Sequence, residues 1–188
     1  MNPLDPEADT DAEGVAWDRL AGLLPEPAAG EVRDCWEIGE QEAGLGLLVG
    51  GLLAYGVALD GTTRAELSVL TETWGEREAL AARLAACADT GAPSPVRLLP
   101  DGETDGESGG ETDGETDDES DDTTGDPVSS VRVPWIACDR CGATLLRIHT
   151  RDPWGEPSYP TEAYVVGDRS WDTAADAYAA LLACSLPA

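Results

Sequence analysis

An acidic stretch at residues 101–126 divides the chain and limits what it can fold into. It contains 13 Asp and Glu residues, separated only by Gly, Ser and Thr. The stretch has no apolar area to bury against the entropy of ordering its backbone, and its like charges repel one another. We therefore predict a disordered acidic linker over 101–127 that acts as a spacer, with mimicry of a nucleic acid as the alternative.

The linker leaves two segments that are each large enough for a small folded unit. We predict an acidic N-terminal tail over 1–30, a first module over 31–100 and a second module over 128–188. The tail carries apolar residues that suit one short amphipathic helix, namely Val15, Trp17, Leu20, Leu23 and Leu24. Such a helix is expected to dock on a domain or on a partner.

Similar residue spacings in the two segments suggest a duplicated module. Trp36 and Trp74 are 38 residues apart, whereas Trp135 and Trp171 are 36 residues apart. A loop can absorb a difference of this size. The pattern therefore predicts two related units in tandem.

Each module is predicted to contain antiparallel strands that one C-terminal helix covers. In the first module, Asp60 and Gly61 lie between two apolar runs, which is a strong signal for a hairpin turn. The covering helix is expected over about 76–87 in the first module and after an Asp172 cap in the second. The expected fold class is thus α+β, as two tandem small modules joined by the linker.

The stretch from Ala43 to Leu59 offers an alternative to the first hairpin. Its 17 residues carry no charge, which suggests a membrane-associated component. A helix that spans a bilayer needs roughly 20 apolar residues, however, and this stretch contains five Gly. The buried hairpin is therefore preferred.

The charge balance indicates the environment of the protein. The chain has 38 Asp and Glu residues against 11 Arg and no Lys, with a formal net charge of −27. Such a surface suits a cytoplasm of about 1 M salt, where a Debye length of roughly 3 Å screens self-repulsion. We predict a haloarchaeal, cytoplasmic protein, since the N-terminus lacks the basic start and apolar core of a secretory signal. An acidic disordered protein is the alternative, which 41% apolar residues and six Trp disfavour.

Composition also argues against several enzyme classes. Without Lys the chain has no phosphate-binding P-loop lysine and no Schiff-base lysine. His149 is the single imidazole, and the one match to the G-x-S-x-G nucleophile motif, at residues 106–110, falls within the acidic stretch. We therefore predict a protein that is not an enzyme.

The most chemically distinctive motif is the C-x-x-C-G sequence at residues 138–142, which lies between two strand-like segments. It resembles the knuckle of zinc ribbons, in which two thiolates bind one ion. Here these would be Cys138 and Cys141, and Gly142 would accept the turned backbone. A zinc ribbon has a second such pair, which this sequence lacks.

The remaining zinc ligands are expected from elsewhere in the chain. His149 is the predicted third ligand, because imidazole nitrogen and thiolate sulfur both suit tetrahedral zinc. The fourth is Cys35, which the repeat places next to the position of Pro134. Asp152 is the local substitute.

Other roles for the thiols stay open. Five Cys in a reducing compartment argue against a disulfide framework. Cys138 and Cys141 are alternatively ordinary thiols or a redox pair, although redox C-x-x-C motifs usually begin a helix, where the dipole lowers the thiol pKa. Cys87 and Cys184 are expected to be small core residues.

The second segment also contains a cationic region in an otherwise acidic chain. Between Val131 and Arg151 there are four Arg residues and one acid, Asp139. The predicted partner-binding residues are Arg132, Arg140, Arg147 and Arg151, with Trp135 and Trp154 available for stacking. They would bind an acidic protein surface or nucleic-acid phosphates, and pairing with nearby Asp and Glu is the alternative.

Together these features predict a non-enzymatic interaction or regulatory protein of a halophilic cytoplasm. It would combine a structural zinc knuckle with an Arg/Trp surface that binds a protein or a nucleic acid. The alternative from another class is a thiol–disulfide oxidoreductase that uses Cys138 and Cys141. The sequence is also compatible with a homo-oligomer.

Overall fold

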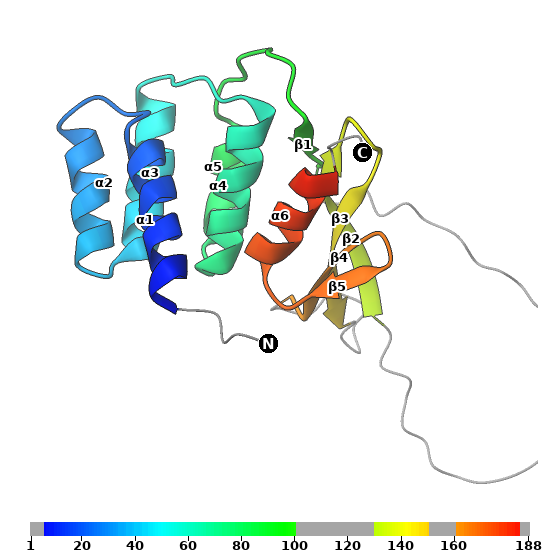
Figure 1. Ribbon diagram of the computed structural model, residues 1–188. Helices are drawn as coiled ribbons and strands as arrows, with labels where there is room; N and C mark the ends of the chain where they lie inside the picture. Colours follow the sequence, from blue (N-terminus) through cyan, green and yellow to red (C-terminus); the bar gives the residue numbers. More distant parts are fainter. Residues whose placement is uncertain (1–5, 101–129, 151–160, 185–188) are drawn as a thin grey trace, which may run out of the picture.

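The computed structural model describes residues 6–100, 130–150 and 161–184, which form a mixed α+β fold (Figure 1). In chain order the elements are α1 (Pro6–Ala21), α2 (Ala28–Glu37), α3 (Gln41–Ala54), α4 (Gly61–Thr73), α5 (Arg77–Ala85), β1 (Val96–Leu98), β2 (Ser130–Cys138), β3 (Thr144–Thr150), β4 (Ala163–Val166), β5 (Arg169–Trp171) and α6 (Ala174–Cys184). The predicted linker at 101–127 lies outside the described residues.

Helices α1 to α5 pack side by side around an apolar core. In α3, the buried residues Leu45, Leu48, Val49 and Leu52 recur every three or four positions, which is the pattern of a helix with one covered face. Trp17 and Leu20 of α1 are buried in the same core. The indole nitrogen of Trp17 donates a hydrogen bond of 2.9 Å to the carbonyl of Val32, which ties α1 to α2.

The five strands form one antiparallel sheet in the order β1 to β5. Its edge strand β1 precedes residue 101, yet it pairs with β2, with Val96 opposite Cys138 and Leu98 opposite Ile136. Figure 1 shows α6 lying between α4 and the strands. Segments from both sides of residues 101–129 thus form one sheet.

A second apolar core joins α4 and α6 to the sheet. Helix α4 contributes Ala65 and Val69. The other large buried members are Val96, Trp135, Ile136, Leu145, Tyr164, Val166, Tyr178 and Leu181. Because this core draws on residues from both sides of 101–129, the described parts of the chain share one folded unit.

The predicted hairpin in the first segment is wrong, because α3 and α4 are both helices. Asp60 caps the N-terminus of α4, where its carboxylate accepts a hydrogen bond of 2.7 Å from the Thr63 amide. A Cβ atom on Gly61 would lie 2.4 Å from the Val96 carbonyl oxygen, so this glycine permits close packing of α4 against β1. The Asp-Gly pair therefore begins a helix and does not turn a hairpin.

The structure also does not show two modules of the same topology. The repeat equates Trp36 with Trp135, but Trp36 lies in helix α2 and Trp135 in strand β2.

The second half does match the prediction in type, since its strands are covered by α6. The helix predicted near residue 76 corresponds to α5. The cap of α6, however, is Thr173, whose hydroxyl accepts from the Asp176 amide at 3.1 Å.

Helix α3 covers most of the stretch for which a membrane span was the alternative. It is 14 residues long. Within residues 6–100, 130–150 and 161–184, no helix has the length and apolar character needed to cross a bilayer.

Candidate functional site

The C-x-x-C-G motif forms the turn between β2 and β3, as the sequence predicts. Cys138 ends β2; its amide donates to the Ala143 carbonyl at 2.8 Å, and the Gly142 amide donates to the Cys138 carbonyl at 2.9 Å. Gly142 has a φ of +73°, a conformation that favours glycine. The side chain of Arg97 donates to Asp139 at 2.9 Å and fastens the turn to β1. Backbone bonds and this ion pair therefore define the turn.

His149 lies at the opposite end of the same hairpin. It pairs with Val131, whereas Thr144, beside the turn, pairs with Ala137. The six residue steps from Val131 to Ala137 span about 20 Å of strand. His149 is therefore not placed to share a metal ion with the two cysteines.

Cys35 lies apart from His149 and from the two knuckle cysteines. It lies on α2 and faces α3, since a Cβ atom on Gly44 would be 3.0 Å from the Cys35 Cβ. Asp152 lies outside the described residues. Among the residues that the structure describes, no three His, Cys, Asp or Glu side chains are grouped so that they could hold a metal ion. A tetrahedral zinc site needs four ligands. The knuckle offers two thiols, of which Cys138 is buried and Cys141 is exposed.

The predicted Arg/Trp surface is divided between the interior and the exterior. Arg147 and Trp135 are both buried, with the guanidinium carbon of Arg147 5.3 Å from the Trp135 ring centroid. Arg132 and Arg140 are exposed. The other two predicted residues, Arg151 and Trp154, lie outside the described residues. The interior pair therefore contributes to the core and not to a docking surface.

Glu72 of α4 is a buried polar centre that the sequence did not single out. Its carboxylate accepts hydrogen bonds from Thr161 at 2.6 Å and Tyr164 at 2.9 Å, and it lies 3.7 Å from Arg77 and 3.9 Å from Arg147. Burial, followed by the charge of Glu72, raises the pKa of Tyr164. These contacts join α4 to β3 and β4. Helical spacing was the available signal for its position. Glu72 lies three residues after Val69 and seven after Ala65, which are both buried on α4.

One partly exposed face of α3 has no charged residue of its own, and we call it the α3 face. It consists of Ala43, Gly46, Leu47, Gly50 and Ala54. Ala43 and Ala54 are exposed, and Leu47 has an exposed fraction of 44%. A Cβ atom on Gly46 would meet no other atom within 4 Å, whereas one on Gly50 would lie 2.9 Å from a guanidinium nitrogen of Arg83. The hairpin prediction did not bring these residues together. They share a face only when residues 41–54 form a helix.

Comparison with known proteins found no matching family model, no matching curated protein and no matching solved structure.

Proposed function

We propose that the protein is a non-enzymatic interaction protein that docks a protein partner on the α3 face. The proposal depends on one observation. In a chain of net charge −27, none of the residues from Ala43 to Ala54 of α3 is charged, and Leu47, near the middle of the helix, is 44% exposed. Contiguous exposed apolar surface of this kind is typical of protein–protein contacts.

The partner is expected to present an apolar strip bordered by basic residues. Gly46 has no side chain, and a Cβ atom there would meet open space, so a partner can approach the α3 backbone closely at this position. Glu40 and Glu42 are exposed where the helix begins, and they would pair with Arg or Lys at the border. A basic partner is therefore favoured.

We also propose that docking takes place in the high-salt cytoplasm inferred from composition. At about 1 M salt the Debye length is roughly 3 Å, so only charges in direct contact interact strongly. The apolar face would then supply most of the affinity. The bordering glutamates would select the partner.

The other proposals have less structural support. Nucleic-acid binding by the Arg/Trp surface would have to proceed without Arg147 and Trp135, which are buried. A redox or zinc role for Cys138 and Cys141 would use a turn between strands, without a helix N-terminus to lower the thiol pKa.

A photo-crosslinking amino acid at position 47 tests the docking proposal in the native host. Val15 is the matched control position, since it is apolar and 72% exposed but lies on α1. We expect position 47, and not position 15, to form a crosslink with one basic protein. Crosslinks to a second copy of this chain, or no crosslink specific to position 47, would contradict the proposal.

A second experiment measures the affinity of the purified partner for the full chain. Leu47→Glu places a charge in an apolar contact, so we expect affinity to fall about tenfold or more. Val15→Glu adds the same charge outside the α3 face and should leave affinity unchanged. Equal effects of the two substitutions would show that net charge, and not the α3 face, controls binding.

A further inference from the structure

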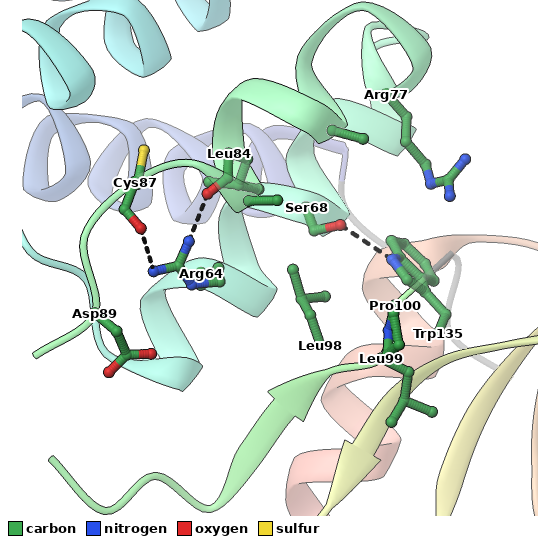
Figure 2. Close-up of a pocket in the computed structure, with 12 residues that line it drawn as sticks. Arg64, Ser68, Arg77, Leu84, Cys87, Asp89, Leu98, Leu99, Pro100 and Trp135 are labelled. Atoms are coloured by element: carbon green, nitrogen blue, oxygen red, sulfur yellow. Dashed lines mark hydrogen bonds between the residues drawn. The ribbon is translucent and has the colours of Figure 1, made fainter. Parts of the chain in front are cut away.

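A cleft lies between the helical layer and the sheet, on residues that the α3 face does not include. It has a volume of about 420 Å³ and is lined by residues of α4, α5, β1 and β2 (Figure 2). Pockets for small ligands have volumes of roughly 300–1,000 Å³. The cleft is therefore large enough for a small organic molecule.

Most of the lining is apolar and firmly held. Leu84 of α5 and Trp135 of β2 are buried, and Leu98 and Leu99 lie beside them in the lining. Figure 2 shows the Trp135 indole directed toward Ser68, to which it donates a hydrogen bond of 3.0 Å. This bond fixes the plane of the indole, so the cleft presents a preformed apolar wall.

The charged residues of the lining are Arg64, Arg77 and the acid Asp89, and Arg77 is paired with Glu72 at 3.7 Å. Arg64 donates hydrogen bonds to the carbonyls of Leu84, Cys87 and Ala88, where α5 ends. These acceptors carry no net charge, so they immobilise the guanidinium without neutralising it. Apolar walls strengthen the field of such a group. Arg64 thus provides a fixed positive charge in the cleft that can attract an anion.

We propose that the cleft binds a small organic carboxylate with a flat apolar body. The body would lie on Leu98, Leu99 and Trp135, and Arg64 would attract the carboxylate. A planar guanidinium suits a carboxylate, and the mostly apolar lining suits a ligand with one charged group. The site is separate from the proposed docking face, so either proposal can fail without the other.

A pair of probes of the same shape tests the charge preference. The probes are 4-(trifluoromethyl)benzoate and the neutral 4-(trifluoromethyl)benzamide, followed by fluorine NMR and by the indole NH signal of Trp135. That signal is assigned by its loss in Trp135→Phe. We expect saturable binding of the benzoate, about threefold to fivefold tighter than the benzamide, with a shift of the Trp135 signal. Equal affinities, or no shift at Trp135, would overturn the proposal.

Substitutions on α5 test the location. Ala81 lines the cleft, whereas its neighbour Ala82 is exposed and is not part of the lining. Ala81→Phe should abolish binding of the benzoate, and Ala82→Phe should preserve it. Ala85→Phe, at an exposed residue of the lining, repeats the test if Ala81→Phe does not fold. Binding that survives both cleft substitutions would place the ligand elsewhere and overturn the proposal.

A substitution at Asp89 tests the charge preference of the cleft without disturbing the fold. Its carboxylate accepts a hydrogen bond from the Gly91 amide, which the side-chain oxygen of Asn can replace. Asp89→Asn removes a negative charge from the cleft and should tighten benzoate binding about twofold to threefold. Unchanged or weaker binding would contradict an anionic ligand.

Discussion

The indole nitrogen of Trp135 in β2 donates a hydrogen bond of 3.0 Å to the hydroxyl oxygen of Ser68 in α4. Both residues are buried, and they lie on opposite sides of residues 101–129. The Arg147 guanidinium of β3 lies over the same indole ring. Trp135 is therefore the point at which α4, β2 and β3 meet, and a polar contact supports the apolar core there.

Ser68→Ala should destabilise the protein, because it leaves the buried indole N–H without its acceptor. We expect the free energy of unfolding to fall by about 1–3 kcal/mol. Denaturant unfolding in high-salt buffer measures it. Ser170→Ala, at an exposed position of β5, is the control and should change stability by less than about 0.5 kcal/mol. Equal effects at the two positions would show that the Trp135 bond contributes nothing.

Stability should decrease in alkaline solution because of two buried tyrosines. Burial, followed by nearby carboxylates, raises the pKa of Tyr164 and Tyr178 above the ordinary value of 10.0. The unfolded chain therefore releases these protons at a lower pH than the folded protein. Their contribution is complete below about pH 10 and is lost as the pH rises toward the folded-state pKa.

Unfolding measured between about pH 8 and pH 11 tests this expectation. The absence of Lys leaves tyrosine and cysteine as the main side chains that titrate in this range. Tyr178→Phe should make the decrease less steep. Tyr55→Phe, at a residue that is 55% exposed, should not. A decrease that is equally steep in both variants would contradict the assignment.

Local patterns identified the second half of the fold better than the first. In β3, Leu145, Arg147 and His149 alternate with less buried residues, and the C-x-x-C-G motif together with the positive φ of Gly142 fixes the preceding turn. The same alternation places Arg147 on the covered face with Leu145. The prediction of Arg147 as a partner-binding residue used its charge alone, and isolated charges are seldom buried.

Contacts between distant segments explain what the local patterns missed. An Asp-Gly pair signals a hairpin turn, but Asp60 also suits a helix cap, and local sequence does not distinguish these roles. The close approach of Val96 to Gly61 decides between them. Strand β1 has three residues and pairs with β2 beyond residue 129, so no short window predicts it. In the predicted zinc set, His149 lies at the opposite end of the β2–β3 hairpin from the two cysteines, a separation that becomes visible only with the strand pairing.

The two cysteines of the knuckle should differ when each is replaced. Cys138 is buried and Cys141 is exposed. Cys138→Ser should lower the free energy of unfolding by about 1–3 kcal/mol, since it buries a hydroxyl in place of a thiol, whereas Cys141→Ser should have an effect below about 0.5 kcal/mol. We also expect a chelator to leave the unfolding transition unchanged, because the turn is held by its own backbone bonds. Equal losses, together with unfolding by the chelator, would instead support a zinc site.

Two glycines at helical positions should respond in opposite directions to alanine. Gly61→Ala places a methyl group 2.4 Å from the Val96 carbonyl oxygen, and pairing with β2 restrains that carbonyl, so we expect a loss of about 2 kcal/mol. Gly46→Ala places its methyl group in open space within α3 and should raise the free energy of unfolding by about 0.5–1 kcal/mol, because alanine loses less backbone entropy in a helix. Denaturant unfolding of both variants in the same buffer measures the difference. If Gly61→Ala were stabilising as well, α4 could not pack against β1 as closely as the structure shows.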